Sequence, residues 1–106
     1  MGQGEGENNI ETPKTVPQSS SEVIMQYGPN VKGMKSACGI VVGEIHPHAA
    51  KRICERNVTF AELADLIKNS SITYPGNKPD RTCLQKDDLR LVLVNSTGEI
   101  RSVVRL

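Results

Sequence analysis

The spacing of apolar residues changes near residue 71, and this change limits the possible folds more than any other feature of the chain. Between residues 47 and 69 apolar side chains recur every three or four positions, which is the period of a helix. From residue 72 onward they alternate with polar side chains, which is the period of a half-buried strand. Helices followed by consecutive strands are typical of an α+β fold. We therefore predict helices packed on one face of a small antiparallel sheet.

The first predicted helix runs from about residue 47 to 56. It starts at Pro47, because proline suits a first helical turn. Its apolar stripe consists of Ala49, Ala50, Ile53 and Cys54. Its other side is a basic ridge of His48, Arg52 and Arg56, with Lys51 and Glu55 beside it. Residues four apart lie on one helix face, so the ridge points away from the apolar stripe.

The second predicted helix begins at Phe60. Thr59 and Glu62 have the spacing of a capping box, in which the side chain of each residue bonds the backbone N–H of the other. Asn69 and Ser70 end the helix. We interpret this helix as structural.

Three or four strands are predicted after the helices: a possible one at 72–74, and others at about 81–85, 89–95 and 99–105. Lys86-Asp87-Asp88 forms one turn, and Asn95-Ser96-Thr97-Gly98 forms the next, with Gly98 free to adopt a positive φ. These short connections predict an antiparallel meander.

The chain is divided into a leader, residues 1–22, and a folded domain, residues 23–106. The leader is polar and has too few apolar residues to offset the entropy of ordering it. Residues 23–27 are predicted as a short ordered segment that Gly28-Pro29 ends, and residues 37–42 as a short strand or helical turn. No apolar stretch is long enough to cross a bilayer, and the first residues lack the pattern of a secretory signal.

The net charge of +1 hides two unlike parts. Residues 1–30 have a net charge of −3, whereas residues 31–106 carry 12 basic and eight acidic side chains, a net charge of +4. The basic part is compatible with a polyanionic partner, although many domains that bind no polyanion have a similar charge. Cys38, Cys54 and Cys83 are odd in number and are interpreted as reduced thiols, and their spacing matches no zinc pattern. We expect neither a metal nor a cofactor.

Common enzyme motifs are absent from the sequence, but its basic residues suit phosphodiester chemistry. Besides the helix ridge, the predicted strands carry Arg81, Arg90, Arg101, Ser102 and Arg105. Cleavage of RNA without metal needs a proton-transfer group, which histidine supplies, and cations that stabilise the charged phosphorane, which arginine supplies. A hydroxyl can orient the phosphate.

Structural explanations of the same residues remain open. A basic helix stripe is most often a solvated face, and His48 can be a simple surface residue. Ser102 shares a predicted strand face with Ile100 and Val104, so a buried, hydrogen-bonded hydroxyl is an alternative. Arg101 and Arg105 can simply face water. Arg81 and its neighbour Thr82 point to opposite sides of a strand, so they do not serve one site.

A resemblance favours the catalytic alternative. The run from Pro47 to Thr59, followed by a helix and an arginine-bearing meander, resembles small domains with a His-Ala-x-x-Arg-x-x-x-Arg helix. Those domains are similar to the barnase, EndoU, colicin and RelE group of metal-independent ribonucleases, and the match covers about residues 46–106. The resemblance implies catalytic roles for His48, Arg52, Arg81 and Ser102. RNA contacts are assigned to Lys51, Arg56, Lys86 and Arg90.

A second resemblance concerns the leader. Glu7-Asn8-Asn9, preceded by Gly6, is similar to the Val-Glu-Asn-Asn boundary before the toxin regions of contact-dependent growth inhibition proteins. Together the two resemblances imply an endoribonuclease toxin exported as the C-terminal part of a larger effector. It would cleave transfer RNA or another RNA in the cytoplasm of a target bacterium, and a cognate immunity protein would neutralise it.

Two non-catalytic functions are the alternatives. One is an immunity or antitoxin partner of such a toxin, which the basic charge of residues 31–106 disfavours. The other is a small RNA-binding regulator, for which the three aromatic residues of the chain offer a poor stacking surface.

Overall fold

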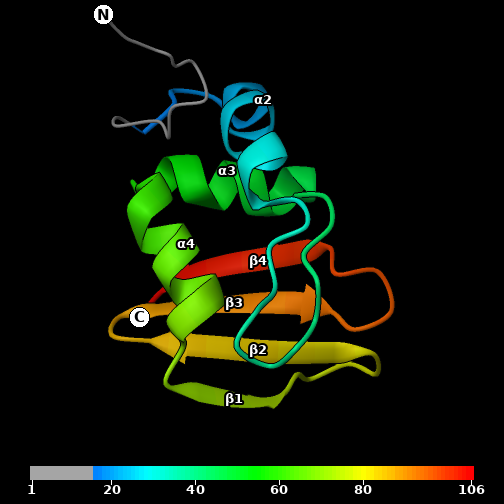
Figure 1. Cartoon of the computed structure of the whole chain (residues 1–106). Coiled ribbons are helices and arrows are strands. Elements are labelled where there is room, and N and C mark those ends of the chain that lie inside the picture. Colours follow the sequence, from blue (N-terminus) through cyan, green and yellow to red (C-terminus); the bar gives the residue numbers. More distant parts are fainter. Residues whose placement is uncertain (1–15) are drawn as a thin grey trace, which may run out of the picture.

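The computed structural model describes residues 16–106, which form three helices and a four-stranded sheet (Figure 1). The helices are α2 (Ser20–Val31), α3 (Pro47–Glu55) and α4 (Phe60–Asn69). The strands are β1 (Ile72–Pro75), β2 (Arg81–Lys86), β3 (Leu89–Val94) and β4 (Ile100–Arg105). The predicted α+β fold is confirmed, and each strand ends within one residue of its predicted bounds.

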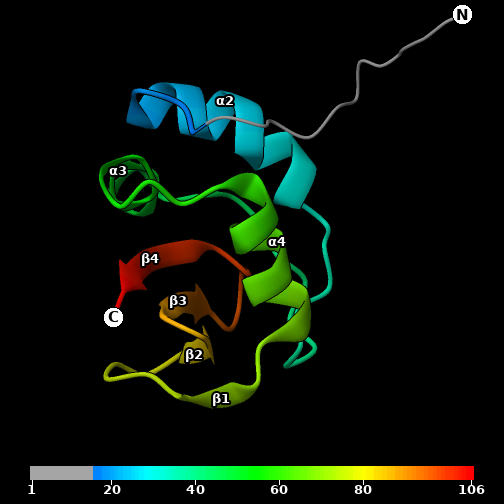
Figure 2. The same cartoon turned by 90° about the vertical axis from the view of Figure 1, so that its left-hand side faces the viewer.

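The sheet is an antiparallel meander in the order β1-β2-β3-β4. Leu84 of β2, Leu91 of β3 and Val103 of β4 are paired across three strands, and each is fully buried. Helix α4 packs over β2 and β3 on the side of these residues, and the segment 32–46 crosses the same side (Figures 1 and 2). We name this side the covered face. The opposite side, which alternate strand residues line, is the open face.

Helix α3 lies along the β4 edge of the sheet and runs in the same direction as this strand (Figure 1). At its start, the His46 backbone N–H donates to the Ile100 carbonyl at 2.9 Å. At its end, the Arg105 side chain donates to the Arg56 carbonyl at 3.2 Å. Helix α2 packs on α3. The helices therefore form a layer that extends past β4, with α4 alone lying over β2 and β3.

The capping box of α4 is formed as the sequence predicts. The Glu62 backbone N–H donates to the Thr59 hydroxyl at 3.1 Å, and the Thr59 backbone N–H donates to the Glu62 carboxylate at 3.0 Å. Both bonds satisfy N–H groups that the first helical turn leaves without partners. The start of α4 is therefore determined locally.

Helix α2 corrects two expectations about the first part of the chain. It begins at Ser20, inside the segment assigned to the leader, and it continues through Gly28-Pro29 instead of ending there. Proline in a helix costs about 3 kcal/mol, but burial of a large apolar side chain contributes about 1.5–3 kcal/mol. Val23, Tyr27 and Val31 follow one another at four-residue intervals and are all fully buried, so packing outweighs the proline.

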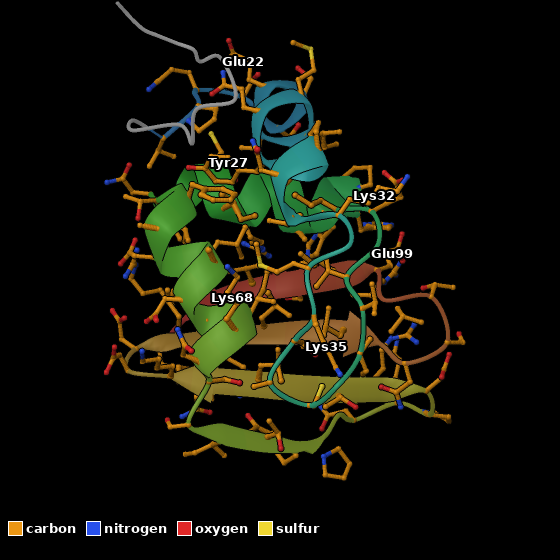
Figure 3. The ribbon with its side chains drawn as sticks, in the orientation of Figure 1. Glu22, Tyr27, Lys32, Lys35, Lys68 and Glu99 are labelled. Carbon is orange, nitrogen blue, oxygen red and sulfur yellow. The ribbon has the colours of Figure 1, made fainter. Side chains whose placement is uncertain are left out.

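Tyr27 joins α2 to the start of α4 (Figure 3). Its hydroxyl donates to the Val58 carbonyl at 3.0 Å, and its ring meets that of Phe60 edge to face. Residues 37–42 form neither a strand nor a helical turn. They belong to a loop that an isolated bridge between Lys35 and Val41 and backbone bonds between residues 33–36 and 40–42 close. The Glu7-Asn8-Asn9 motif lies outside the described residues.

Gly98 holds the β3–β4 turn against the segment that crosses the sheet. Its φ is +74°, as the sequence predicts, and a Cβ there would collide with the Val41 carbonyl oxygen. Its own carbonyl accepts the Gly43 N–H at 2.8 Å. Both the turn and the close approach of two backbones therefore require glycine.

We predict opposite effects for two glycine substitutions. Gly98→Ala should lower the free energy of unfolding by more than about 1 kcal/mol, because a Cβ is disfavoured by both φ and contact. Gly28→Ala is the matched control. Gly28 lies within α2 with open space around it, so alanine there should raise the free energy of unfolding by about 0.5–1 kcal/mol. Urea unfolding measures both. Equal effects of the two substitutions would contradict this account of Gly98.

Candidate functional site

A pocket of about 290 Å³ opens on the open face of the sheet. Strands β1 to β4 and the β1–β2 loop all contribute to its wall. We name it the basic pocket, and its charged and hydroxyl-bearing residues are Tyr74, Lys78, Arg81, Arg90, Arg101 and Ser102.

The strand register explains why these residues meet. Tyr74, Cys83, Val92 and Ser102 are paired in one row across all four strands. Arg81 lies two residues before Cys83 on β2, and Arg90 lies two residues before Val92 on β3. Because β2 and β3 run in opposite directions, the two guanidinium groups lie on opposite sides of the row.

A β-bulge adds Arg101 to the pocket. Ile100 pairs with Leu93 and Ser102 pairs with Val92, which leaves Arg101 as an extra residue between them. Because of this insertion Ile100 is buried in the core whereas Ser102 lines the basic pocket. The expectation that Ser102 shares a face with Ile100 is therefore wrong, and the bulge is the reason.

The basic pocket has an uncompensated positive charge. Four cationic side chains line it and no carboxylate does. Among residues 16–106, only Arg101 of these four has an ion pair, with Glu99 at 3.4 Å. A concave site lined by charges of one sign attracts ligands of the opposite sign. This arrangement can bind an anion with several hydrogen-bond acceptors, such as a phosphodiester.

The structure places the residues of the predicted site in three groups. Arg81, Ser102 and Arg90 meet in the basic pocket. The residues of the α3 ridge lie outside its lining: His48, Lys51 and Arg56 are exposed, and Arg52 is half-buried. Lys86 pairs with Asp65 of α4 and lies in a separate small cavity rich in carboxylates.

Helix α3 nevertheless borders the strand that supplies Arg101 and Ser102. The His46 ring nitrogen Nδ1 accepts the His48 backbone N–H at 3.0 Å, so His46 caps the helix. The His46 backbone is bonded to Ile100, the residue before the bulge, and the first turn of α3 therefore starts beside the bulge. Arg52 is paired with Glu55 at 3.4 Å, which occupies part of its guanidinium.

Arg105 has a structural environment and does not face water, contrary to one expectation. Its guanidinium donates to carboxylate oxygens of Glu62 at 3.3 and 3.4 Å and of Asp88 at 3.1 Å. It also donates to the carbonyls of Arg56 and Asn57. Arg105 therefore joins β4 to both helix ends and to the β2–β3 turn.

Tyr74 and Lys78 also line the basic pocket, although no sequence pattern predicts them as site residues. The alternation of residues 72–74 indicates a strand, yet only the register with β2 shows that Tyr74 lies beside Cys83. Lys78 lies in the β1–β2 loop, whose path no periodic pattern predicts. Neither residue carried a local signal of function.

Three cysteines are free in the structure, as predicted for reduced thiols. Within residues 16–106 no three His, Cys, Asp or Glu side chains lie close enough together to hold a metal ion. In the same part of the chain no helix is both long and apolar enough to cross a membrane. Comparison with known proteins found no matching family model, no matching curated protein and no matching solved structure.

We predict that Glu62 makes the stability depend on acid pH. Its pKa lies below the ordinary value of 4.5, chiefly because its carboxylate accepts the Thr59 N–H and secondarily because of Arg105. A carboxyl group with a lowered pKa in the folded state stabilises the fold above its ordinary pKa, and this contribution is lost as the pH falls through the lowered value. Glu62→Gln should therefore lower Tm at pH 7.

The difference in Tm between wild type and Glu62→Gln should shrink as the pH falls below 4.5 toward acid unfolding. Glu44→Gln is the control, since this exposed carboxylate has only a surface ion pair with Lys32. Circular dichroism melts at pH 7 and at acid pH measure the effect. A difference that stays constant with pH would contradict the role of Glu62.

Proposed function

We propose that this chain is a metal-independent endoribonuclease that cleaves RNA at the basic pocket. The observation that carries the proposal is the pocket itself, in which four cations and no carboxylate surround a row that ends at the Ser102 hydroxyl. The ribose 2′-hydroxyl loses its proton and its oxygen attacks the adjacent phosphorus, while the P–O5′ bond breaks and the departing 5′-oxygen gains a proton. The phosphorane between these steps carries added negative charge on its phosphoryl oxygens, and preorganised cations stabilise it. The positive charge is thus located where the reaction needs it.

Three side chains of the basic pocket have roles in the proposed reaction. Arg81 and Arg90 bind the phosphate from opposite sides of the row, because guanidinium groups form paired hydrogen bonds with phosphate oxygens. The Ser102 hydroxyl donates a further hydrogen bond that orients the phosphate. These roles use the residues that the strand register brings together.

We assign proton transfer to His48. This assignment is supported by the resemblance of the α3 motif to the helix of the metal-independent ribonucleases and by the course of α3 along β4. Histidine exchanges protons near neutral pH. In the proposal Arg52 of the same helix also binds the phosphate, which requires its ion pair with Glu55 to open. Lys51 and Arg56 are exposed on α3 and extend the basic surface available to the RNA backbone.

The biological role belongs to the same proposal. The resemblance of the helix motif and of the leader motif supports a toxin that an effector delivers to a rival bacterium, with transfer RNA as the substrate. A cognate immunity protein would block it, and an acidic surface on that protein would complement the basic pocket. A small acidic protein encoded in the neighbouring reading frame would support this assignment.

The cleavage test uses purified protein and total transfer RNA in EDTA. Wild type should cut the RNA. Arg81→Ala and Arg90→Ala should each lower the rate about 10²- to 10³-fold, as loss of a transition-state donor does. His48→Ala should lower it about 10²- to 10⁴-fold. Gel electrophoresis of end-labelled RNA measures the rates.

Lys68→Ala is the matched control for charge. Lys68 is an exposed cation on α4, over the covered face, and it has no ion pair within residues 16–106 (Figure 3). Its loss changes the net charge by the same amount and should leave the rate unchanged. Equal losses in Lys68→Ala and Arg90→Ala would show that overall charge, and not the basic pocket, accounts for cleavage.

One observation favours a second candidate function, an RNA-binding module without catalysis. His48 does not line the basic pocket, so the pocket alone explains binding but supplies no histidine. Such a module would bind RNA with a steep dependence on salt and leave it intact. Binding without cleavage by wild type in EDTA would favour this function.

Growth of a producing strain gives a further prediction. Expression of wild type without an immunity protein should arrest growth, because the RNase would act on the RNA of the host. Arg90→Ala should relieve the arrest, whereas Lys68→Ala should not. Colony counts after induction measure the effect, with immunoblots to match protein levels, and growth of the wild-type producer would contradict the toxin assignment.

A further inference from the structure

Three side chains from neighbouring strands are hydrogen-bonded across the open face. The Tyr74 hydroxyl of β1 donates to the Gln85 side-chain oxygen of β2 at 3.2 Å. The Arg90 guanidinium of β3 donates to the Tyr74 hydroxyl at 3.5 Å. Gln85 and Arg90 are direct partners in the register, and Tyr74 is paired with Cys83, two residues before Gln85. Tyr74 therefore reaches diagonally over β2 to Arg90.

Arg90 and Arg105 are held in different ways. Arg105 donates to two carboxylates, which neutralise its charge within the fold. Arg90 has a neutral hydroxyl as its partner, and among residues 16–106 it forms no ion pair. A neutral acceptor restricts the orientation of a guanidinium but leaves its charge uncompensated. Arg90 is thus held in the pocket wall with its charge available to a ligand.

We infer that Tyr74 is a positioning residue, which holds Arg90 in the orientation that binds a phosphodiester group of an RNA strand. Gln85 takes part by accepting the hydrogen bond that the Tyr74 hydroxyl donates, which leaves a lone pair of the phenol oxygen for Arg90. The inference rests on the proposed function, since it assigns the phosphate contact of the same pocket. The hydrogen bond from Arg90 to Tyr74 also raises the pKa of Arg90.

Preorganisation is the physical reason for such a residue. A long arginine side chain on an open sheet face samples many rotamers, and binding must fix one of them at a cost of about 0.5–1.5 kcal/mol. The hydroxyl of Tyr74 is carried on a strand and restricts Arg90 before the ligand arrives. Removal of the hydroxyl alone should weaken binding through Arg90 while the aromatic ring stays in place.

The test is a double-mutant cycle on binding. The probe is a fluorescein-labelled single-stranded 2′-O-methyl oligoribonucleotide, which lacks the free 2′-hydroxyl needed for cleavage, and anisotropy gives Kd. Tyr74→Phe should weaken binding about threefold to tenfold, and Arg90→Ala should weaken it at least as much. The double variant should bind no more weakly than Arg90→Ala, because coupled residues are not additive.

Tyr27→Phe is the matched control. It also removes one tyrosine hydroxyl bond, here to the Val58 carbonyl inside the core, so it should lower Tm and leave Kd unchanged. Tyr74→Phe should show the reverse pattern, with an altered Kd and little change in Tm. A purely structural role of Tyr74 would give both tyrosine variants the pattern of Tyr27→Phe.

The outcomes separate this inference from the proposed function. Wild type could bind the probe while the effects of Tyr74→Phe and Arg90→Ala are additive, or while Tyr74→Phe leaves Kd unchanged. Either result would overturn the positioning role and leave the RNA site intact. Failure of wild type to bind the probe would overturn the proposed function and the positioning role together. Non-additive loss with normal stability would support the positioning role and the RNA site, and the cleavage test in EDTA decides catalysis.

Discussion

One side chain near the end of the chain, Arg105, ties the end of α3 and the start of α4 to the sheet. Its guanidinium bonds the carbonyls of Arg56 and Asn57, where α3 ends, and the carboxylate of Glu62 in the first turn of α4. It also bonds Asp88 in the turn that joins β2 and β3. Three segments distant in the sequence are thereby held to the last strand. Only the bonds to Glu62 are partly buried, so the contribution of Arg105 comes from joining several segments at one point more than from the strength of any one ion pair.

The two faces of the sheet use their cations for different purposes. On the covered side, Arg105 and Lys86 form ion pairs with carboxylates of α4, and Arg105 also pairs with one in the β2–β3 turn. On the open face, Arg81 and Arg90 have only neutral oxygen partners among residues 16–106. A net charge of +4 over residues 31–106 says nothing of this division. Because carboxylates pair with the cations of the covered side, the unpaired cations of the sheet lie together in the basic pocket. This local positive charge is the basis of the proposed binding of RNA.

Sequence patterns predicted what local interactions determine and missed what depends on distant contacts. The capping box at Thr59 and the alternation of the strands need only neighbouring residues, and both are confirmed. The helix through Pro29 depends on burial of Tyr27 against Val58 and Phe60, which lie about 30 residues away, so a local rule placed the end of this helix too early. The bulge at Arg101 arises from pairing with β3, and the alternation of apolar and polar residues along β4 could not reveal it.

The same bulge links the two parts of the proposed site. Ile100 accepts the N–H of His46, the cap of α3, and the next two residues, Arg101 and Ser102, both line the basic pocket. Without the inserted residue, strict alternation would put Ser102 on the face of Ile100, and the hydroxyl would be directed into the core. The segment that anchors the helix bearing His48 is therefore also the segment that supplies a cation and a hydroxyl to the pocket. A shared anchor fixes the position of α3 relative to the basic pocket, as the proposed proton transfer between His48 and a bound phosphodiester would require.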